Sequence, residues 1–127
     1  MSLYQPSSLI NGEWVSASSG ATFDVINPAT GQVVEKVADL SASDCAKAID
    51  AAESAFPKWA AMTAKERATV LRRWFNLIME HTDRLAVLIT EEMGKPLAEA
   101  RGEVAYGASF VDWFAEEGRR TVSYTHL

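Results

Sequence analysis

The chain has 127 residues, of which 48% are apolar and 23% are charged, and its formal net charge at pH 7 is −5. This length suits one domain or part of a larger one, and the composition is that of a folded soluble protein. No stretch supplies the basic face that nucleic-acid binding needs, and no apolar run approaches a membrane span, so neither a nucleic acid nor a membrane is expected as a partner.

Residues 1–40 show the pattern of short β-strands. Leu9-Ile10 and Trp14-Val15 flank Asn11-Gly12, a dipeptide that suits a tight turn because both of its residues tolerate positive φ. A second pair of strands is expected at residues 23–26 and 32–37, joined by the turn at residues 27–31. The sequence therefore predicts an N-terminal antiparallel β segment.

From Leu40 onward the apolar residues recur at steps of three and four, which is typical of amphipathic helices. Ser41 and Asp44 have capping-box spacing and predict the start of a first helix, which Pro57 either ends or bends. The apolar stripe of this helix contains Cys45, Ala48, Ile49, Ala52, Ala55 and Phe56.

Three further helices follow. Thr63 and Glu66 form a full capping box and predict the start of a second helix, and Thr82 is the predicted N-cap of a third. Gly94 suits the left-handed position after a helix end, and Pro96 suits the first turn of a fourth helix that runs to about residue 119. The apolar stripe of the second helix is Val70, Leu71, Trp74, Phe75 and Ile78, and that of the fourth is Leu97, Ala100, Val104, Ala108, Val111, Phe114 and Ala115.

The apolar stripes of these helices are broad, and the β segment has edges for which the chain offers no partner. Both features indicate a piece that packs against something else.

The Gly94-Lys95 pair raises the question of a phosphate-binding loop. Such a loop needs a glycine five residues earlier and a serine or threonine directly afterwards, whereas this chain has Ile89 and Pro96 at those positions. The pair is therefore interpreted as a helix end.

Other candidate chemistry is sparse. Cys45 lies in an apolar helical stripe without a histidine beside it, so a buried structural thiol is expected rather than a nucleophile. Trp113 and Phe114 are either core residues or the wall of a ligand site. From the residues alone, the chain shows no complete catalytic constellation.

Four segments, in this order and at this spacing, resemble the N-terminal part of the NAD(P)-dependent aldehyde dehydrogenases. They are LINGEWV, FDVINPATGQVV, AAESAFPKWAAMTAKERATVLRRW and ITEEMGKPLAEARGEV. The runs AFPKWAAMTAKERATVLRRWFNLI and FVDWFAEEGRR most resemble succinate-semialdehyde dehydrogenases.

The resemblance implies an α/β parent fold and oxidation of an aldehyde to a carboxylic acid with NAD or NADP. A cysteine attacks the carbonyl, a hydride passes to the dinucleotide, and a glutamate activates the water that hydrolyses the thioester. In the family the nucleophilic cysteine, the glutamate base, the oxyanion asparagine and the nucleotide-contacting loops all follow the segments seen here. No catalytic or cofactor-binding residue is therefore assigned in this chain, and Cys45 does not match the catalytic motif.

Two minor roles are implied by the resemblance. Some family members bind a monovalent cation through backbone carbonyls and a carboxylate, and the matching positions are Val25, Ile26 and Glu103. In some members aromatic residues line the aldehyde tunnel, and the matching positions are Trp113 and Phe114.

The resemblance also divides the chain into an N-terminal β segment (1–40), an incomplete helical part of the nucleotide-binding domain (41–120) and a non-family tail (121–127). TVSYTHL resembles translated sequencing-adapter DNA, so a truncated gene with a foreign tail is expected. The parent enzyme is expected to be a homodimer or homotetramer. A single cysteine and the lack of a signal-peptide pattern suit the cytoplasm.

Two functions stay open for the chain itself. The first is an enzyme fragment that is inactive alone, and the second is a non-catalytic helical module that binds a partner or serves in assembly. A cooperatively melting monomer or dimer favours the module, and a molten or aggregating chain favours the fragment.

Overall fold

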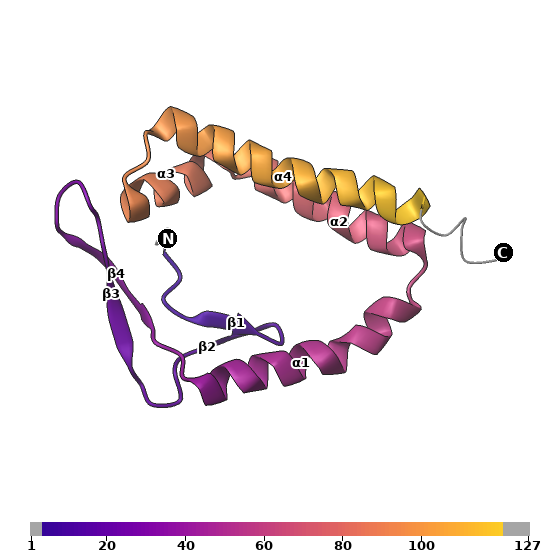
Figure 1. The fold of residues 1–127 in the computed structure, drawn as a ribbon, viewed down its shortest axis with the longest axis horizontal. Coiled ribbons are helices and arrows are strands. Elements are labelled where there is room, and N and C mark those ends of the chain that lie inside the picture. Colours follow the sequence, from indigo (N-terminus) through magenta and orange to yellow (C-terminus); the bar gives the residue numbers. More distant parts are fainter. Residues whose placement is uncertain (1–3, 121–127) are drawn as a thin grey trace. The chain divides into compact units, whose positions relative to one another are not determined.

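The computed structural model describes residues 4–120, so the predicted foreign tail lies outside the described residues. Figure 1 shows four strands followed by four helices. The strands are β1 (Ser8–Ile10), β2 (Glu13–Val15), β3 (Thr22–Ile26) and β4 (Val33–Ala38). The helices are α1 (Ala42–Ala61), α2 (Ala64–Glu80), α3 (Thr82–Met93) and α4 (Leu97–Arg120).

The described chain divides into two compact units. The first contains residues 4–57 and 91–94, and the second contains residues 58–90 and 95–120. No helix formed by residues 4–120 is long and apolar enough to cross a membrane.

The first unit contains two separate two-stranded antiparallel sheets, β1–β2 and β3–β4. Asn11 and Gly12 join β1 to β2 with φ values of 53° and 80°, which confirms the tight turn predicted from this dipeptide. Asn27 begins the turn between β3 and β4: its carbonyl accepts from the Gly31 N–H at 2.8 Å, and its side chain accepts from the Ala29 N–H at 2.9 Å. Both predicted strand pairs are therefore present.

Helix α1 begins where the capping-box spacing predicted. The Ser41 hydroxyl accepts from the Asp44 N–H at 3.2 Å, and the Asp44 carboxylate accepts from the Ser41 N–H at 3.1 Å. Pro57 lies inside the helix, which continues to Ala61, so this proline does not end it.

Helix α2 has the predicted capping box at Thr63 and Glu66. The prediction of Thr82 as an N-cap is wrong. His81 is the C-cap of α2, and its carbonyl accepts from the Leu85 N–H at 3.0 Å at the start of α3. Thr82 is already helical, and its hydroxyl donates back to the Met79 carbonyl at 2.8 Å.

Gly94 follows α3 with φ of 80°, as expected for a left-handed residue that closes a helix. A Cβ atom at this position would lie 3.0 Å from the Cγ atom of Pro28, so the turn after β3 leaves little room for a side chain. The Pro96 carbonyl accepts from the Ala100 N–H at 2.9 Å, which places Pro96 one residue before α4. Gly94 and Lys95 thus belong to a helix end, as predicted.

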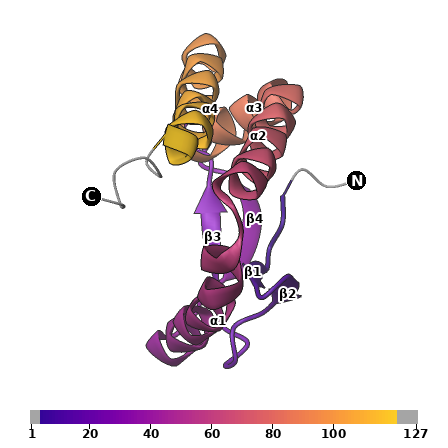
Figure 2. The same ribbon diagram turned by 90° about the vertical axis from the view of Figure 1, so that its right-hand side faces the viewer.

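Helices α2 and α4 form the main packing interface of the second unit and run side by side in both views (Figures 1 and 2). The core residues of this unit are small: Ala68, Ala86, Ala100, Val104, Ala108 and Ala115. Within residues 4–120 no large side chain is fully buried.

Candidate functional site

The C-terminal half of α4 exposes aromatic side chains. Phe110, Trp113 and Phe114 are 48%, 63% and 59% exposed, and together with Ser109 they line a pocket of about 350 Å³. Aromatic walls with few polar groups are typical of sites that bind small organic molecules. The structure thus brings the two predicted tunnel residues, Trp113 and Phe114, into one pocket.

The apolar stripe of α4 is narrower than the sequence pattern predicted. Ala100, Val104, Ala108 and Ala115 are buried, whereas Phe114 is exposed. Adjacent helical residues point about 100° apart, so Phe114 and Ala115 cannot share one direction. Placing Phe114 in the buried stripe was therefore wrong for the described residues.

Tyr106 extends the aromatic surface by one helical turn. Its ring meets that of Phe110 edge-to-face, with centroids 4.9 Å apart and an interplanar angle of 87°. This arrangement is favourable for aromatic pairs, and it orients Phe110 at the edge of the pocket.

Arg72 of α2 binds the polar side of α4 beside this pocket. Its guanidinium forms ion pairs with Asp112 and Glu116, the latter at 2.8 Å, and its Cζ atom lies 5.8 Å from the centroid of the Phe75 ring. All three charged side chains are partly exposed, so these two contacts between α2 and α4 stabilise the helix pair only modestly.

The three predicted cation ligands belong to different units. Val25 and Ile26 lie in β3, where the register against β4 shifts between them. Such a shift interrupts regular strand pairing next to the two carbonyls. Glu103 lies on α4, and its carboxylate forms an ion pair with the Lys95 ammonium. Oxygen atoms of carbonyls and carboxylates suit a monovalent cation. The positive charge of Lys95 already balances the carboxylate of Glu103 in part.

Cys45 is exposed, so the expectation of a buried thiol was wrong. It lies in the first turn of α1. Among residues 4–120, no cluster of three or more histidine, cysteine, aspartate or glutamate side chains could hold a metal ion.

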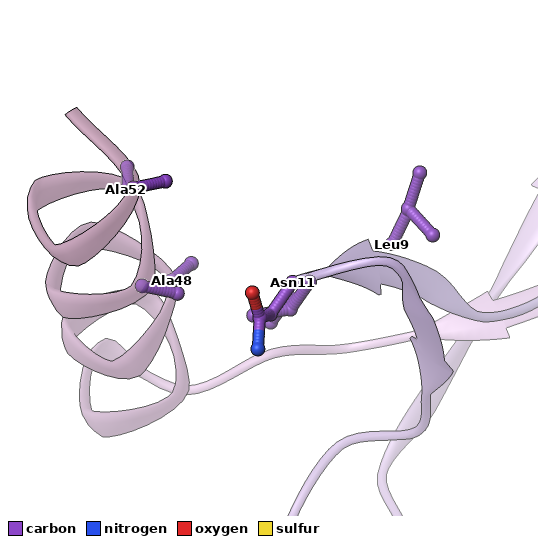
Figure 3. A pocket seen from close by; sticks show the side chains of 7 residues that line it. Leu9, Asn11, Ala48 and Ala52 are labelled. Carbon is purple, nitrogen blue, oxygen red and sulfur yellow. The ribbon is translucent and has the colours of Figure 1, made fainter. Parts of the chain in front are cut away.

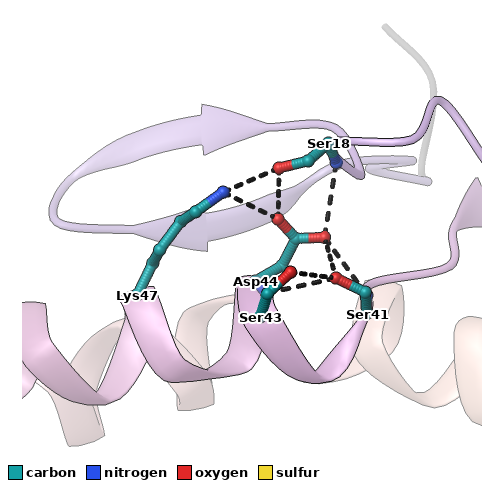
Figure 4. A network of polar contacts seen from close by, with 5 residues as sticks. All are labelled: Ser18, Ser41, Ser43, Asp44 and Lys47. Carbon is teal, nitrogen blue, oxygen red and sulfur yellow. Dashed lines mark hydrogen bonds and ion pairs between the residues drawn. The ribbon is translucent and has the colours of Figure 1, made fainter.

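Asp44 is the centre of a polar network that the sequence pattern revealed only in part (Figure 4). Its carboxylate accepts from the backbone and hydroxyl of Ser18, from the hydroxyl of Ser41 at 2.8 Å and from the Lys47 ammonium at 3.1 Å. These hydrogen bonds stabilise the ionised carboxylate and hold the pKa of Asp44 well below its usual range. The hydrogen bond from the Ser18 hydroxyl has the largest effect. The capping spacing indicated Ser41, whereas Ser18, 26 residues away, left no local signal.

A second pocket, of about 260 Å³, lies between the β1–β2 turn and α1 (Figure 3). Its lining is apolar apart from Asn11: Leu9, Ile10, Ala48, Ala51, Ala52 and Ala55. The pocket contains no charged side chain, so it offers no acid–base chemistry.

Comparison with known proteins adds to this geometry. The aldehyde dehydrogenase family profile matches residues 14–126. The chain is 58% identical over 118 residues to succinate-semialdehyde dehydrogenase [NADP(+)] GabD of Escherichia coli. The aligned segment covers 93% of this chain and 24% of that protein. It is 53% identical over 118 residues to a glutarate-semialdehyde dehydrogenase of Pseudomonas putida, covering 93% and 25%.

Solved structures are also similar to this chain. A crystal structure of an E. coli NADP-dependent enzyme matches with a TM-score of 0.91 and 58% identity, covering 93% of this chain and 24% of that one. A succinate-semialdehyde dehydrogenase from Burkholderia pseudomallei matches with a TM-score of 0.90 and 52% identity at the same coverage. The chain spans about a quarter of the length of these relatives, and its two small sheets and four helices are part of their α/β fold. The chain therefore belongs to the aldehyde dehydrogenase family.

Proposed function

We propose that the chain is the N-terminal part of an NAD(P)-dependent dehydrogenase that oxidises succinate semialdehyde to succinate. The 58% identity to an enzyme of that name, over 93% of the chain, is the observation that carries this proposal. A glutarate-semialdehyde dehydrogenase is almost as similar, so the proposed substrate class is an aldehyde that carries a carboxylate at its other end.

In the proposed reaction the aldehyde and a water molecule yield the carboxylic acid, and the dinucleotide, when bound, accepts the hydride. Cys45, the single cysteine of the chain, does not match the family's catalytic motif, so no nucleophile is assigned among the described residues. The catalytic cysteine, glutamate and asparagine therefore belong to the remainder of the enzyme, as do the cofactor contacts, and residues 41–120 are part of the nucleotide-binding domain.

The chain's own contribution is the aromatic surface of α4. Phe110, Trp113 and Phe114 form an apolar wall that excludes water and guides the methylene groups of the aldehyde. Ion pairs of Arg72 with Asp112 and Glu116 link this part of α4 to α2.

A second proposed contribution is a monovalent-cation site formed by Val25, Ile26 and Glu103. Two backbone carbonyls and one carboxylate supply hard oxygen ligands for such an ion. The Lys95 ammonium pairs with the same carboxylate, so the ion and Lys95 share the charge of Glu103. The parent enzyme is further proposed to act as a cytoplasmic homodimer or homotetramer.

The test is to recover the source gene beyond codon 120 and to express the protein that it encodes. We expect NAD(P)H formation with succinate semialdehyde, slower turnover with glutarate semialdehyde, and little with an aldehyde of equal length that has no carboxylate. A preference for the uncharged aldehyde would contradict the proposed substrate class. Parallel assays with NAD and NADP give the cofactor preference.

A further inference from the structure

We propose that the face of α2 formed by Val70, Trp74 and Leu77 is an intramolecular docking surface, covered by the part of the enzyme that follows this chain. These residues recur at steps of four and three, so they share one side of the helix. Their exposed fractions are 47%, 56% and 44%. The inference rests on the proposal that the chain is part of a longer enzyme.

The burial pattern of α2 indicates that α4 packs against another face of the helix. Ala68 is buried and Leu71, Phe75 and Ile78 are half-buried, and these residues follow the same helical spacing on the side of α2 adjacent to the Val70 face. Helix α2 therefore has two neighbouring apolar faces, of which α4 covers one. A helix with such a broad apolar arc is typical of a protein interior rather than of a surface.

The burial pattern shows how much apolar packing is missing. The buried apolar residues of the described chain are alanines and one valine, whereas large apolar side chains are exposed on every strand and every helix. A tryptophan that loses its exposed area contributes a large share of the stabilisation of an interface, so Trp74 is expected to be the anchor of this face.

The remainder of the same polypeptide is the occupant that fits best. About three quarters of each matched relative lies outside the aligned segment, which is enough chain to cover many faces at once. A second copy of this chain would cover one self-complementary patch, not apolar surfaces on all eight elements of two separate units. The face has no cluster of basic residues, so it does not suit a nucleic acid.

The test measures side-chain accessibility in two proteins. The first is the 127-residue chain, and the second is a spliced enzyme in which only the 118 aligned residues of this chain replace their counterparts in the E. coli relative. In each, Cys45 is changed to serine, and Leu77→Cys or Val70→Cys is introduced and labelled with a maleimide, with the labelled site located by mass spectrometry. Asn76→Cys is the matched control, because Asn76 is exposed and points away from the face.

We expect the thiols at positions 70 and 77 to react at least tenfold more slowly in the spliced enzyme than in the isolated chain, and the thiol at position 76 to react at similar rates in both. Rapid labelling at positions 70 and 77 in the spliced enzyme would overturn the proposal. Protection already present in the isolated chain, together with a dimeric sedimentation coefficient, would assign the face to a second copy and overturn it as well. Because labelling needs no turnover, the wrong substrate would not affect the result.

Discussion

The backbone N–H of Ser18 donates to the Oδ2 atom of Asp44 at 3.3 Å, and this contact joins the loop after β2 to the first turn of α1. The Asp44 side chain is only 5% exposed, yet every partner it needs is present. A buried carboxylate with this many donors stays ionised, and it positions both segments at once.

Removing the charge of Asp44 is expected to loosen this junction. In the spliced enzyme, Asp44→Asn should speed amide hydrogen exchange in residues 16–20 and 41–47, because the amide accepts fewer and weaker hydrogen bonds than the carboxylate. Asp50→Asn, an exposed aspartate on the same helix, is the control and should leave these rates unchanged. Equal effects of the two variants would show that the network does not hold the junction.

The same carboxylate predicts a pH dependence. The pKa of Asp44 is lower in the folded state than its usual value of about 4 in an unfolded chain. Its contribution to stability is therefore present above about pH 4 and is lost as the pH falls toward the folded-state pKa. The difference in Tm between the spliced enzyme and its Asp44→Asn variant should shrink steadily below about pH 4, and a constant difference would contradict this assignment.

Replacing Trp113 is expected to change the KM for the aldehyde but not the KM for the dinucleotide. In the spliced enzyme, Trp113→Ala should raise KM for succinate semialdehyde several-fold, because the apolar wall loses its largest side chain, and it should leave KM for NADP unchanged. Trp14→Ala is the matched control, since Trp14 is exposed to a similar degree but lies on β2. Unchanged kinetics in the Trp113 variant would remove this residue from the tunnel.

Glu103 is expected to make the stability of the enzyme sensitive to potassium. If Val25, Ile26 and Glu103 hold the ion, potassium chloride should raise the Tm of the spliced enzyme relative to choline chloride at equal ionic strength. Glu103→Gln should abolish that difference, whereas Asp83→Asn, which breaks the ion pair with Arg101, should preserve it. A Tm that responds equally in all three proteins would refute the site.

The isolated 127-residue chain is expected to show no NAD(P)-linked oxidation of succinate semialdehyde, since the catalytic cysteine, glutamate and asparagine are proposed to follow the described segments. Its exposed apolar side chains should bind the dye ANS, and its thermal unfolding should be broad. A sharp, cooperative transition in a monomer would favour the alternative function, a non-catalytic helical module, and measurable turnover would overturn the assignment of the catalytic residues.

Local chemistry predicted most of the elements. The Asn11-Gly12 turn, the capping box of Thr63 and Glu66 and the helix end at Gly94 are formed by residues a few positions apart, so the sequence shows them directly. Thr82 was misassigned because the turn around His81 serves two helices at once, and capping propensity cannot reveal that.

The candidate site was predictable only by resemblance. Trp113 and Phe114 match family positions, and Phe110 shares their side of α4 by helical spacing, but only the structure shows that this side is exposed and forms a pocket. Cys45 and Phe114 were placed in buried stripes because spacing shows which residues share a face but not whether another element covers that face.

The sequence by itself thus determined both strand pairs, their turns and most of the helix ends, and it determined the family, because caps, turn residues and motif spacing act within short stretches of chain. Only the tertiary structure decided which apolar faces are covered. Burial depends on contacts between residues far apart in the sequence, as in the hydrogen bond between Ser18 and Asp44 and the packing of α2 against α4.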